Sequence, residues 1–147
     1  MVLFLCQACF QHYPEDYFIN LQNNSGKYVL PAEGLDYPVD SVDIDTWRVL
    51  GPGEVSRTTN GNEKPGSWTW LFPGIQYVSI YVFDGGMFDY EVKGIRNYEK
   101  YPELVLLARY DLTLEDLRRL NWLCTYPPDE RMKDVHMFPP YSELKGR

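Results

Sequence analysis

The pattern of hydrophobic and polar positions predicts a series of short β-strands separated by turns. Residues 77–83 form the strongest strand, because β-branched and aromatic side chains follow one another almost without a break, and we expect it at the centre of a sheet. Residues 103–110 make another largely buried segment, and residues 54–58 an exposed strand. Residues 42–50 fit either one strand with a bulge or two short strands.

A hairpin is predicted near the start of the domain. Residues 17–21 and 27–30 have the composition of strands, and residues 23–26 between them tolerate left-handed backbone dihedrals and therefore favour a turn. Pro31 is expected to end the second strand. Residues 32–41 are then predicted to be a loop.

One short α-helix is predicted near residues 114–120. Thr113 can cap its N-terminus, and Asp116 three residues later completes a capping box. The leucines of this segment give the helix one apolar stripe, so it needs to pack on the sheets to be stable. Residues 122–126 follow as the last strand, and the tail beyond Pro128 is expected to be ordered only in part.

Length and composition fit one globular domain. The chain has 147 residues, of which 44% are hydrophobic, enough for a single buried core. The elements above are short and mostly strands. We therefore predict a mainly β fold, an antiparallel β-sandwich of immunoglobulin-like type with one short helix, formed by residues 13–147. Residues 1–12 are expected to be a separate terminal segment.

This terminal segment bears on localisation. Residues 1–9 resemble the end of a secretory signal running into a lipoprotein-type cysteine, although the usual basic residues are missing. We expect an extracytoplasmic protein whose true signal begins upstream. Cys9 is the better candidate for lipid attachment because the small Ala8 precedes it, and Cys6 is the second. The alternative is that residues 2–6 form an edge strand.

The cysteines also allow a metal or redox interpretation. Cys6 and Cys9 have the spacing of a redox motif or a zinc knuckle, with His12 close by and Cys124 and His136 far downstream. No βαβ pattern surrounds the pair, so we expect no metal and no cofactor. If the pair leaves with a signal, Cys124 remains as a small buried hydrophobe.

Charge excludes several partners. The formal net charge is −7, and the 14 basic residues are scattered among 21 acidic ones. Nucleic acids and anionic membrane surfaces are therefore disfavoured, since both need clustered Lys and Arg. No apolar stretch approaches the length of a transmembrane helix. Membrane attachment is expected only through a lipid anchor, and the oligomeric state stays open.

Known catalytic motifs are absent from the sequence. It contains no nucleophile elbow, no phosphate-binding glycine-rich loop and no zinc-protease helix motif, and only two histidines. We therefore predict that the protein is not an enzyme, while a carboxylate-pair glycoside hydrolase stays open as an alternative. Asp40, Asp43 and Asp45 are interpreted as a solvated face, with a calcium site as the sharper alternative.

Aromatic residues are the feature that points to a function. Trp68 and Trp70 would share a face if they lie in a strand, and with Tyr77 and Tyr81 they could form a platform for a sugar ring or a protein. The alternative is that this face belongs to the core between the sheets. Two further tryptophans are expected in the core, namely Trp47 and Trp122.

A resemblance supports the same picture. Residues 106–128 read LLARYDLTLEDLRRLNWLCTYPP and resemble the ending of a group of small uncharacterised lipoproteins from Bacteroidetes. That resemblance implies an envelope-located β-rich domain and brings no known activity. We therefore hypothesise a secreted or lipid-anchored accessory domain that binds a glycan or protein at the cell envelope. A purely structural envelope protein without a ligand is the rival.

Overall fold

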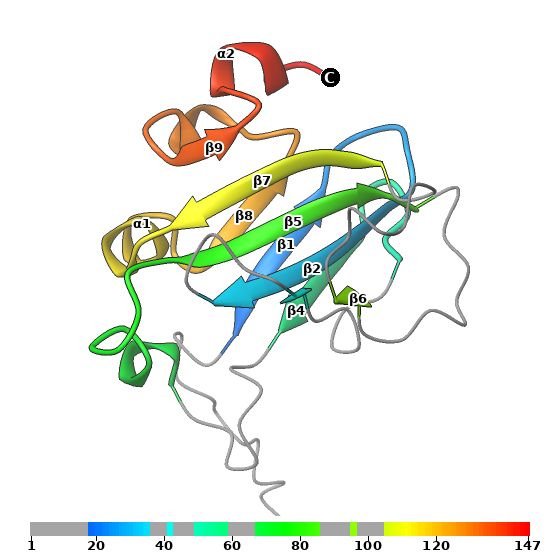
Figure 1. Ribbon diagram of the computed structural model, residues 1–147. Helices are drawn as coiled ribbons and strands as arrows, with labels where there is room; N and C mark the ends of the chain where they lie inside the picture. Colours follow the sequence, from blue (N-terminus) through cyan, green and yellow to red (C-terminus); the bar gives the residue numbers. More distant parts are fainter. Residues whose placement is uncertain (1–17, 36–40, 43–48, 59–66, 86–94, 97–104) are drawn as a thin grey trace, which may run out of the picture.

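The predicted mainly β fold is confirmed. The computed structural model describes residues 18–35, 41–42, 49–58, 67–85, 95–96 and 105–147. Two β-sheets pack face to face, with short helices at their ends (Figure 1). A further small sheet pairs β3 (Ser41–Val42) with β6 (Ile95–Arg96).

Each main sheet joins distant parts of the chain. The three-stranded sheet has the order β4-β1-β8, and the four-stranded sheet the order β2-β5-β7-β9. The strands of the first are β4 (Val55–Thr58), β1 (Ile19–Asn23) and β8 (Leu123–Tyr126). Those of the second are β2 (Val29–Leu35), β5 (Val78–Asp84), β7 (Leu106–Leu112) and β9 (His136–Phe138).

The position of β5 confirms the central strand predicted at residues 77–83. It pairs with β2 on one side and β7 on the other, antiparallel in both cases. The exposed strand predicted at residues 54–58 is β4, at the edge of its sheet. One pair departs from the antiparallel sandwich that we expected, because β1 and β8 run parallel.

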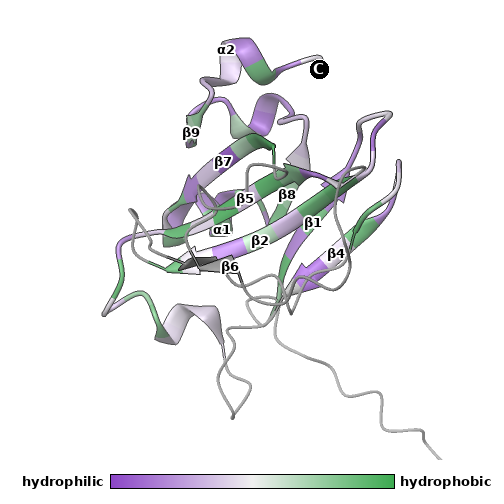
Figure 2. Ribbon diagram, turned by 45° about the vertical axis from the view of Figure 1, so that its right-hand side comes forward, coloured by the Kyte–Doolittle hydropathy of each residue, from purple (hydrophilic) through white to green (hydrophobic). Residues whose placement is uncertain are grey.

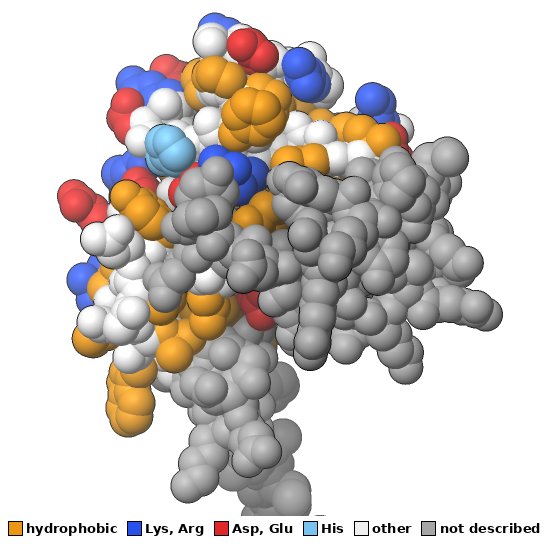
Figure 3. Space-filling model, in the orientation of Figure 1, with side chains coloured by type: hydrophobic (Ala, Val, Ile, Leu, Met, Phe, Trp, Pro, Cys, Tyr) orange, Lys and Arg blue, Asp and Glu red, His pale blue; other side chains and the backbone are white. Residues whose placement is uncertain are grey.

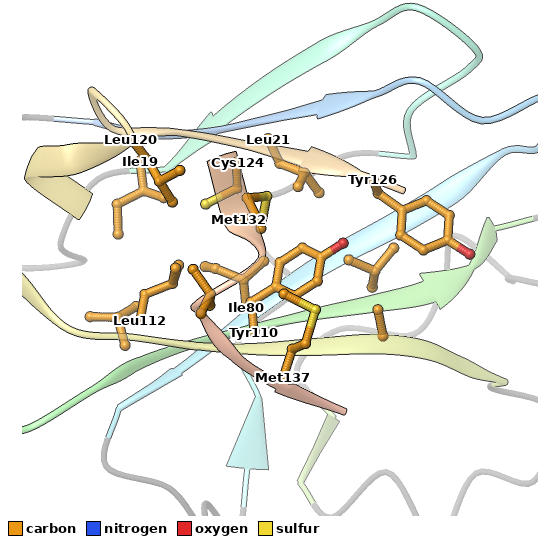
Figure 4. Packing of buried hydrophobic residues seen from close by; sticks show 14 of the residues in the cluster. Ile19, Leu21, Ile80, Tyr110, Leu112, Leu120, Cys124, Tyr126, Met132 and Met137 are labelled. Atoms are coloured by element: carbon orange, nitrogen blue, oxygen red, sulfur yellow. The ribbon is translucent and has the colours of Figure 1, made fainter. Parts of the chain in front are cut away.

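The core lies between the two sheets. Figure 4 shows Ile19, Leu21 and Cys124 of one sheet facing Ile80 and Tyr110 of the other. All five side chains are fully buried. Alternation along the strands produces this arrangement, since every second residue of a strand points to the same face. In Figure 2 the strands of both sheets carry hydrophobic residues, coloured green.

The predicted hairpin is wrong. β1 and β2 belong to different sheets, so the turn between them carries the chain across the sandwich. Asn23 holds this crossing from a buried position: its side-chain amide donates to the carbonyls of Lys27 (2.7 Å) and Leu50 (3.1 Å). Its Oδ1 accepts from the Ser25 amide and hydroxyl. These bonds replace the cross-strand pairing that a hairpin would make.

Pro31 does not end its strand as predicted, and β2 continues to Leu35 through part of the expected loop. Proline lacks an amide proton and is tolerated where the strand lies at the edge of a sheet. β2 is such an edge, with β5 as its neighbour in the four-stranded sheet.

The predicted helix is α1 (Leu114–Arg119) and has the expected capping box. The Thr113 hydroxyl accepts from the Asp116 amide at 3.1 Å, and the Asp116 carboxylate accepts from the Thr113 amide at 3.1 Å. Leu117 packs in the core. Two residues with positive φ, Asn121 and Trp122, then turn the chain into β8.

The tail is more regular than predicted. After β8 come a 3-10 turn (Glu130–Met132), β9 and the short helix α2 (Tyr141–Leu144). The expectation of partial order is wrong because this segment supplies core side chains. Met132 and Leu144 are fully buried, and Met137 extends the core beside Tyr110. The strand predicted as the last, β8, is followed by one more.

Several predictions fall outside the described residues. They concern the terminal segment with Cys6, Cys9 and His12, the core position of Trp47, and the acidic residues Asp40, Asp43 and Asp45. Most of the strand or strand pair expected at residues 42–50 is also outside them. Within the described part of the chain, no helix is long and apolar enough to cross a membrane.

Candidate functional site

The two tryptophans predicted to share a strand face do not. Trp68 and Trp70 lie in a 3-10 helix (Trp68–Trp70), where successive residues turn by about 120°. The two side chains therefore point in different directions. Trp68 is 1% exposed and belongs to the core, whereas Trp70 is 82% exposed. The predicted face is thus split between core and surface.

The two tyrosines of the predicted platform are much less exposed than Trp70. Tyr81 lies on the outer face of the four-stranded sheet and is buried there, with its ring stacked on Phe83 at a centroid distance of 6.2 Å. Tyr77, just before β5, is half-buried. The four residues do not make one exposed platform, and Trp70 is the member that solvent reaches most.

A short, well-anchored turn presents Trp70. The Ser67 hydroxyl accepts from the Thr69 amide at 3.2 Å and caps the turn. Trp68 fixes one side of it in the core, and three partly buried residues that follow pack against that core, namely Leu71, Phe72 and Ile75. The exposed indole is therefore held on a supported backbone, although the turn itself is only three residues long.

A second cluster lies on the outer face of the four-stranded sheet. The register aligns Ser79, Asp111 and His136 in one row across β5, β7 and β9. Two positions further along each strand, a second row on the same face holds Tyr81, Arg109 and Phe138. We call these six residues the β5–β7–β9 patch. The row between them, Ile80, Tyr110 and Met137, points into the core.

Asp111 is the centre of this patch. Its carboxylate is 2% exposed and accepts hydrogen bonds from three side chains. The Ser79 hydroxyl donates to Oδ1 at 2.8 Å, and Arg109 Nε lies 3.1 Å from the same oxygen. His136 Nδ1 lies 2.7 Å from Oδ2. A buried carboxylate needs such partners, because charge is costly to remove from water.

The hydrogen bond to Asp111 fixes the tautomer of the neutral His136 ring. A carboxylate only accepts hydrogen bonds, so Nδ1 must carry the proton, and Nε2 of the neutral ring is then an acceptor. His136 is 71% exposed. None of the residues that the structure describes hydrogen-bonds to Nε2. The patch thus presents an oriented acceptor to solvent.

The three residues Ser79, Asp111 and His136 do not form a nucleophilic triad. In such a triad the histidine lies between the serine and the acid, and takes the serine proton. Here the acid lies in the middle, and the fully buried Ser79 hydroxyl donates a hydrogen bond to Asp111. The arrangement can bind and orient a ligand, but Ser79 is not placed to attack one.

The second row adds an aromatic surface. Phe138 is 56% exposed, and the Arg109 guanidinium carbon lies 6.0 Å from its ring centre. Figure 3 shows this face of the molecule: histidine, in pale blue, lies beside basic side chains in blue, with hydrophobic side chains in orange above it. His136 and Phe138 are two residues apart on β9, so a polar acceptor and an exposed ring lie on the same face of this strand.

This patch was not predicted from the sequence, although Tyr81 was one of the predicted ligand-binding residues. Arg109 and Asp111 are two apart in β7 and therefore share a face, but the strand predicted at residues 103–110 ended before Asp111. Asp111 and His136, moreover, are separated by 25 positions. Their contact depends on β9, which lies in a tail that we expected to be only partly ordered.

Cys124 is a buried residue of the core, as predicted. It makes no disulfide. Burial raises the pKa of this thiol to about 12; the charge of Arg131 lowers the pKa by less, and the charges of Asp116 and Asp129 add to the increase. Among the described residues, no group of three or more His, Cys, Asp or Glu side chains is arranged to hold a metal ion.

Comparison with known proteins adds no relative. No family model matches the chain, and neither a curated protein nor a solved structure matches it. The function is therefore inferred from the residues and their geometry.

Proposed function

We propose that the protein is a non-catalytic binding module that recognises a glycan through Trp70. The observation that supports this proposal is the exposure of the Trp70 indole, which is 82%, on a turn anchored by the buried Trp68. The indole is a large and rigid contact surface, and aromatic side chains dominate the energetics of binding surfaces. A flat indole offers the surface on which a sugar ring stacks.

The test compares Trp70→Ala with a matched control. Tyr28→Ala is suitable, because it removes another exposed aromatic ring that lies on a different turn. Binding of both variants and of the native chain would be measured by affinity electrophoresis in gels containing neutral polysaccharides. We expect Trp70→Ala to weaken retention about tenfold, equal to ~1.4 kcal/mol, and Tyr28→Ala to leave it unchanged. Equal retention of Trp70→Ala and native chain would contradict the proposal.

Absence of retention for the native chain would favour the rival function, a structural protein without a ligand. Trp68→Ala is not used in this test. Its side chain fills the core, so its loss would destabilise the fold whatever the ligand.

We also propose that the protein is extracytoplasmic, with a lipid on Cys9 or, as the second choice, on Cys6. The support is the apolar stretch that precedes these cysteines. Expression with the upstream region, followed by membrane fractionation and intact mass, tests this. A membrane-bound form carrying a lipid mass on Cys9 or Cys6 is expected. A soluble form that keeps Met1 would contradict it.

A further inference from the structure

We propose that the β5–β7–β9 patch is a second contact for the same class of ligand, binding one neutral sugar ring between His136 and Phe138. This inference rests on the proposed function, because it names a further site for a glycan. Its evidence is independent of Trp70, which lies on a turn outside the patch. Three properties of the patch support it: a fixed acceptor, an exposed ring and a suitable spacing.

The acceptor is Nε2 of His136. The other ring nitrogen, Nδ1, is hydrogen-bonded to Asp111 at 2.7 Å, and Ser79 and Arg109 hydrogen-bond to Asp111 in turn. The ring orientation is therefore set before a ligand arrives, which lowers the entropic cost of binding. A sugar hydroxyl can donate to Nε2 without displacing another described residue.

The exposed ring is that of Phe138. More than half of this side chain is exposed, and the Arg109 guanidinium carbon lies 6.0 Å from its ring centre. Sugar rings carry apolar faces of C–H groups, which pack on aromatic faces. The ring of Phe138 can therefore pack against the flat face of a sugar, while the hydroxyls at the edge of the sugar reach polar neighbours.

The spacing joins the two contacts. His136 and Phe138 are two residues apart on β9, so their side chains leave the same face of the strand about 7 Å apart. One sugar ring with its hydroxyl substituents can bridge that distance. A charged ligand fits less well, because Asp111 balances Arg109 within the patch and the chain carries a net charge of −7.

The experiment follows the imidazole proton signals of the full chain by NMR. The chain has two histidines, His12 and His136, so the variant His136→Gln assigns their signals. The probes are the methyl glycosides of glucose, galactose, mannose and N-acetylglucosamine at millimolar concentration. We expect at least one of them to shift the His136 signals in a saturable way and to leave those of His12 in place.

Two variants test the role of the aromatic ring. Phe138→Ala is expected to weaken the apparent affinity about tenfold. Val105→Ala, which also removes an exposed apolar side chain but outside the patch, should leave it unchanged. If no glycoside shifts the His136 signals, or if both variants bind alike, the second contact is excluded.

The two proposals fail in different ways. Loss of polysaccharide retention in Trp70→Ala, with His136 signals that no glycoside moves, would support the Trp70 contact and exclude the patch. Normal retention in Trp70→Ala, with saturable His136 shifts that Phe138→Ala weakens, would exclude Trp70 and leave the patch as the glycan site.

Discussion

At the scale of single residues, the Asp111 carboxylate makes a strong prediction about stability. Asp111→Ala would leave the fully buried Ser79 hydroxyl without its acceptor and would remove one partner each from Arg109 and His136. Buried donors that lose their partners are costly, so we expect the free energy of unfolding to fall by about 2–3 kcal/mol. Urea denaturation followed by tryptophan fluorescence measures this change.

The matched variant for this prediction is His136→Gln. It removes one of the three partners of Asp111, but from a side chain that is largely in water. We therefore expect a loss below ~1 kcal/mol, because a side chain that is largely in water gains little net free energy from one hydrogen bond. A loss in His136→Gln as large as that in Asp111→Ala would contradict the view that the buried carboxylate, and not the exposed imidazole, carries the stability.

Residue-level features differed in how well the sequence predicted them. The burial of Cys124 and Trp122 followed from apolar surroundings and is confirmed. The shared face of Trp68 and Trp70 was wrong because it assumed a strand repeat of two, whereas the segment forms a 3-10 turn. The contact of Asp111 with His136 could not be read from local patterns, since it depends on which strands become neighbours.

At the scale of elements, the junction of β5 and β2 gives a second prediction. Gly85 follows β5, and its amide donates to the carbonyl of Tyr28 at 2.9 Å. A Cβ placed there would meet the backbone of Val29 at 2.9 Å, closer than real Cβ contacts allow. Backbone cannot rotate away as a side chain can, so we expect Gly85→Ala to cost about 1–3 kcal/mol in urea denaturation.

Gly26 supplies the control for this prediction. It lies in the turn between β1 and β2, and nothing lies within 4 Å of the position that its Cβ would take. Its φ is not positive, so alanine needs no strained backbone. Gly26→Ala should therefore change the free energy of unfolding by less than ~1 kcal/mol. If both alanine variants unfold alike, the close approach at Gly85 is not a determinant of stability.

Local signals explain which elements were predicted. The run of β-branched and aromatic residues in β5 and the capping box of α1 act within a few residues, and both are confirmed. The turn after β1 carried an equally local signal, yet its strands separate into two sheets. Turn residues show that the chain changes direction. They do not show whether it stays in the same sheet.

At the scale of the whole molecule, the core is formed by segments from both ends of the chain. β1 lies beside β8 in one sheet, and β9 completes the other next to β7. Composition and periodicity predicted the class of fold, because periodicity indicates short strands and composition indicates a buried core. They could not predict the order of the strands, which is decided by long-range packing.

The pH dependence of unfolding tests this core as a unit. Burial raises the pKa of Cys124 from 9.0 to about 12, and burial, followed by the charge of Cys124, raises the pKa of Tyr110 well above 10.0. Both groups are neutral when protonated, and the folded chain holds their protons more tightly than the unfolded chain. Their contribution to stability is complete below about pH 9 and is lost as the pH rises toward 12.

We therefore expect the free energy of unfolding to fall above pH 9 by about 1.4 kcal/mol per pH unit for each group that is neutral only when folded. Urea denaturation at a series of alkaline pH values measures the slope. Cys124→Ala keeps Tyr110 and its hydrogen bond to the Thr125 carbonyl, so it should lower the slope without abolishing it. A slope equal to that of the native chain would mean that Cys124 is not held in a dry core, and would contradict the packing between the two sheets.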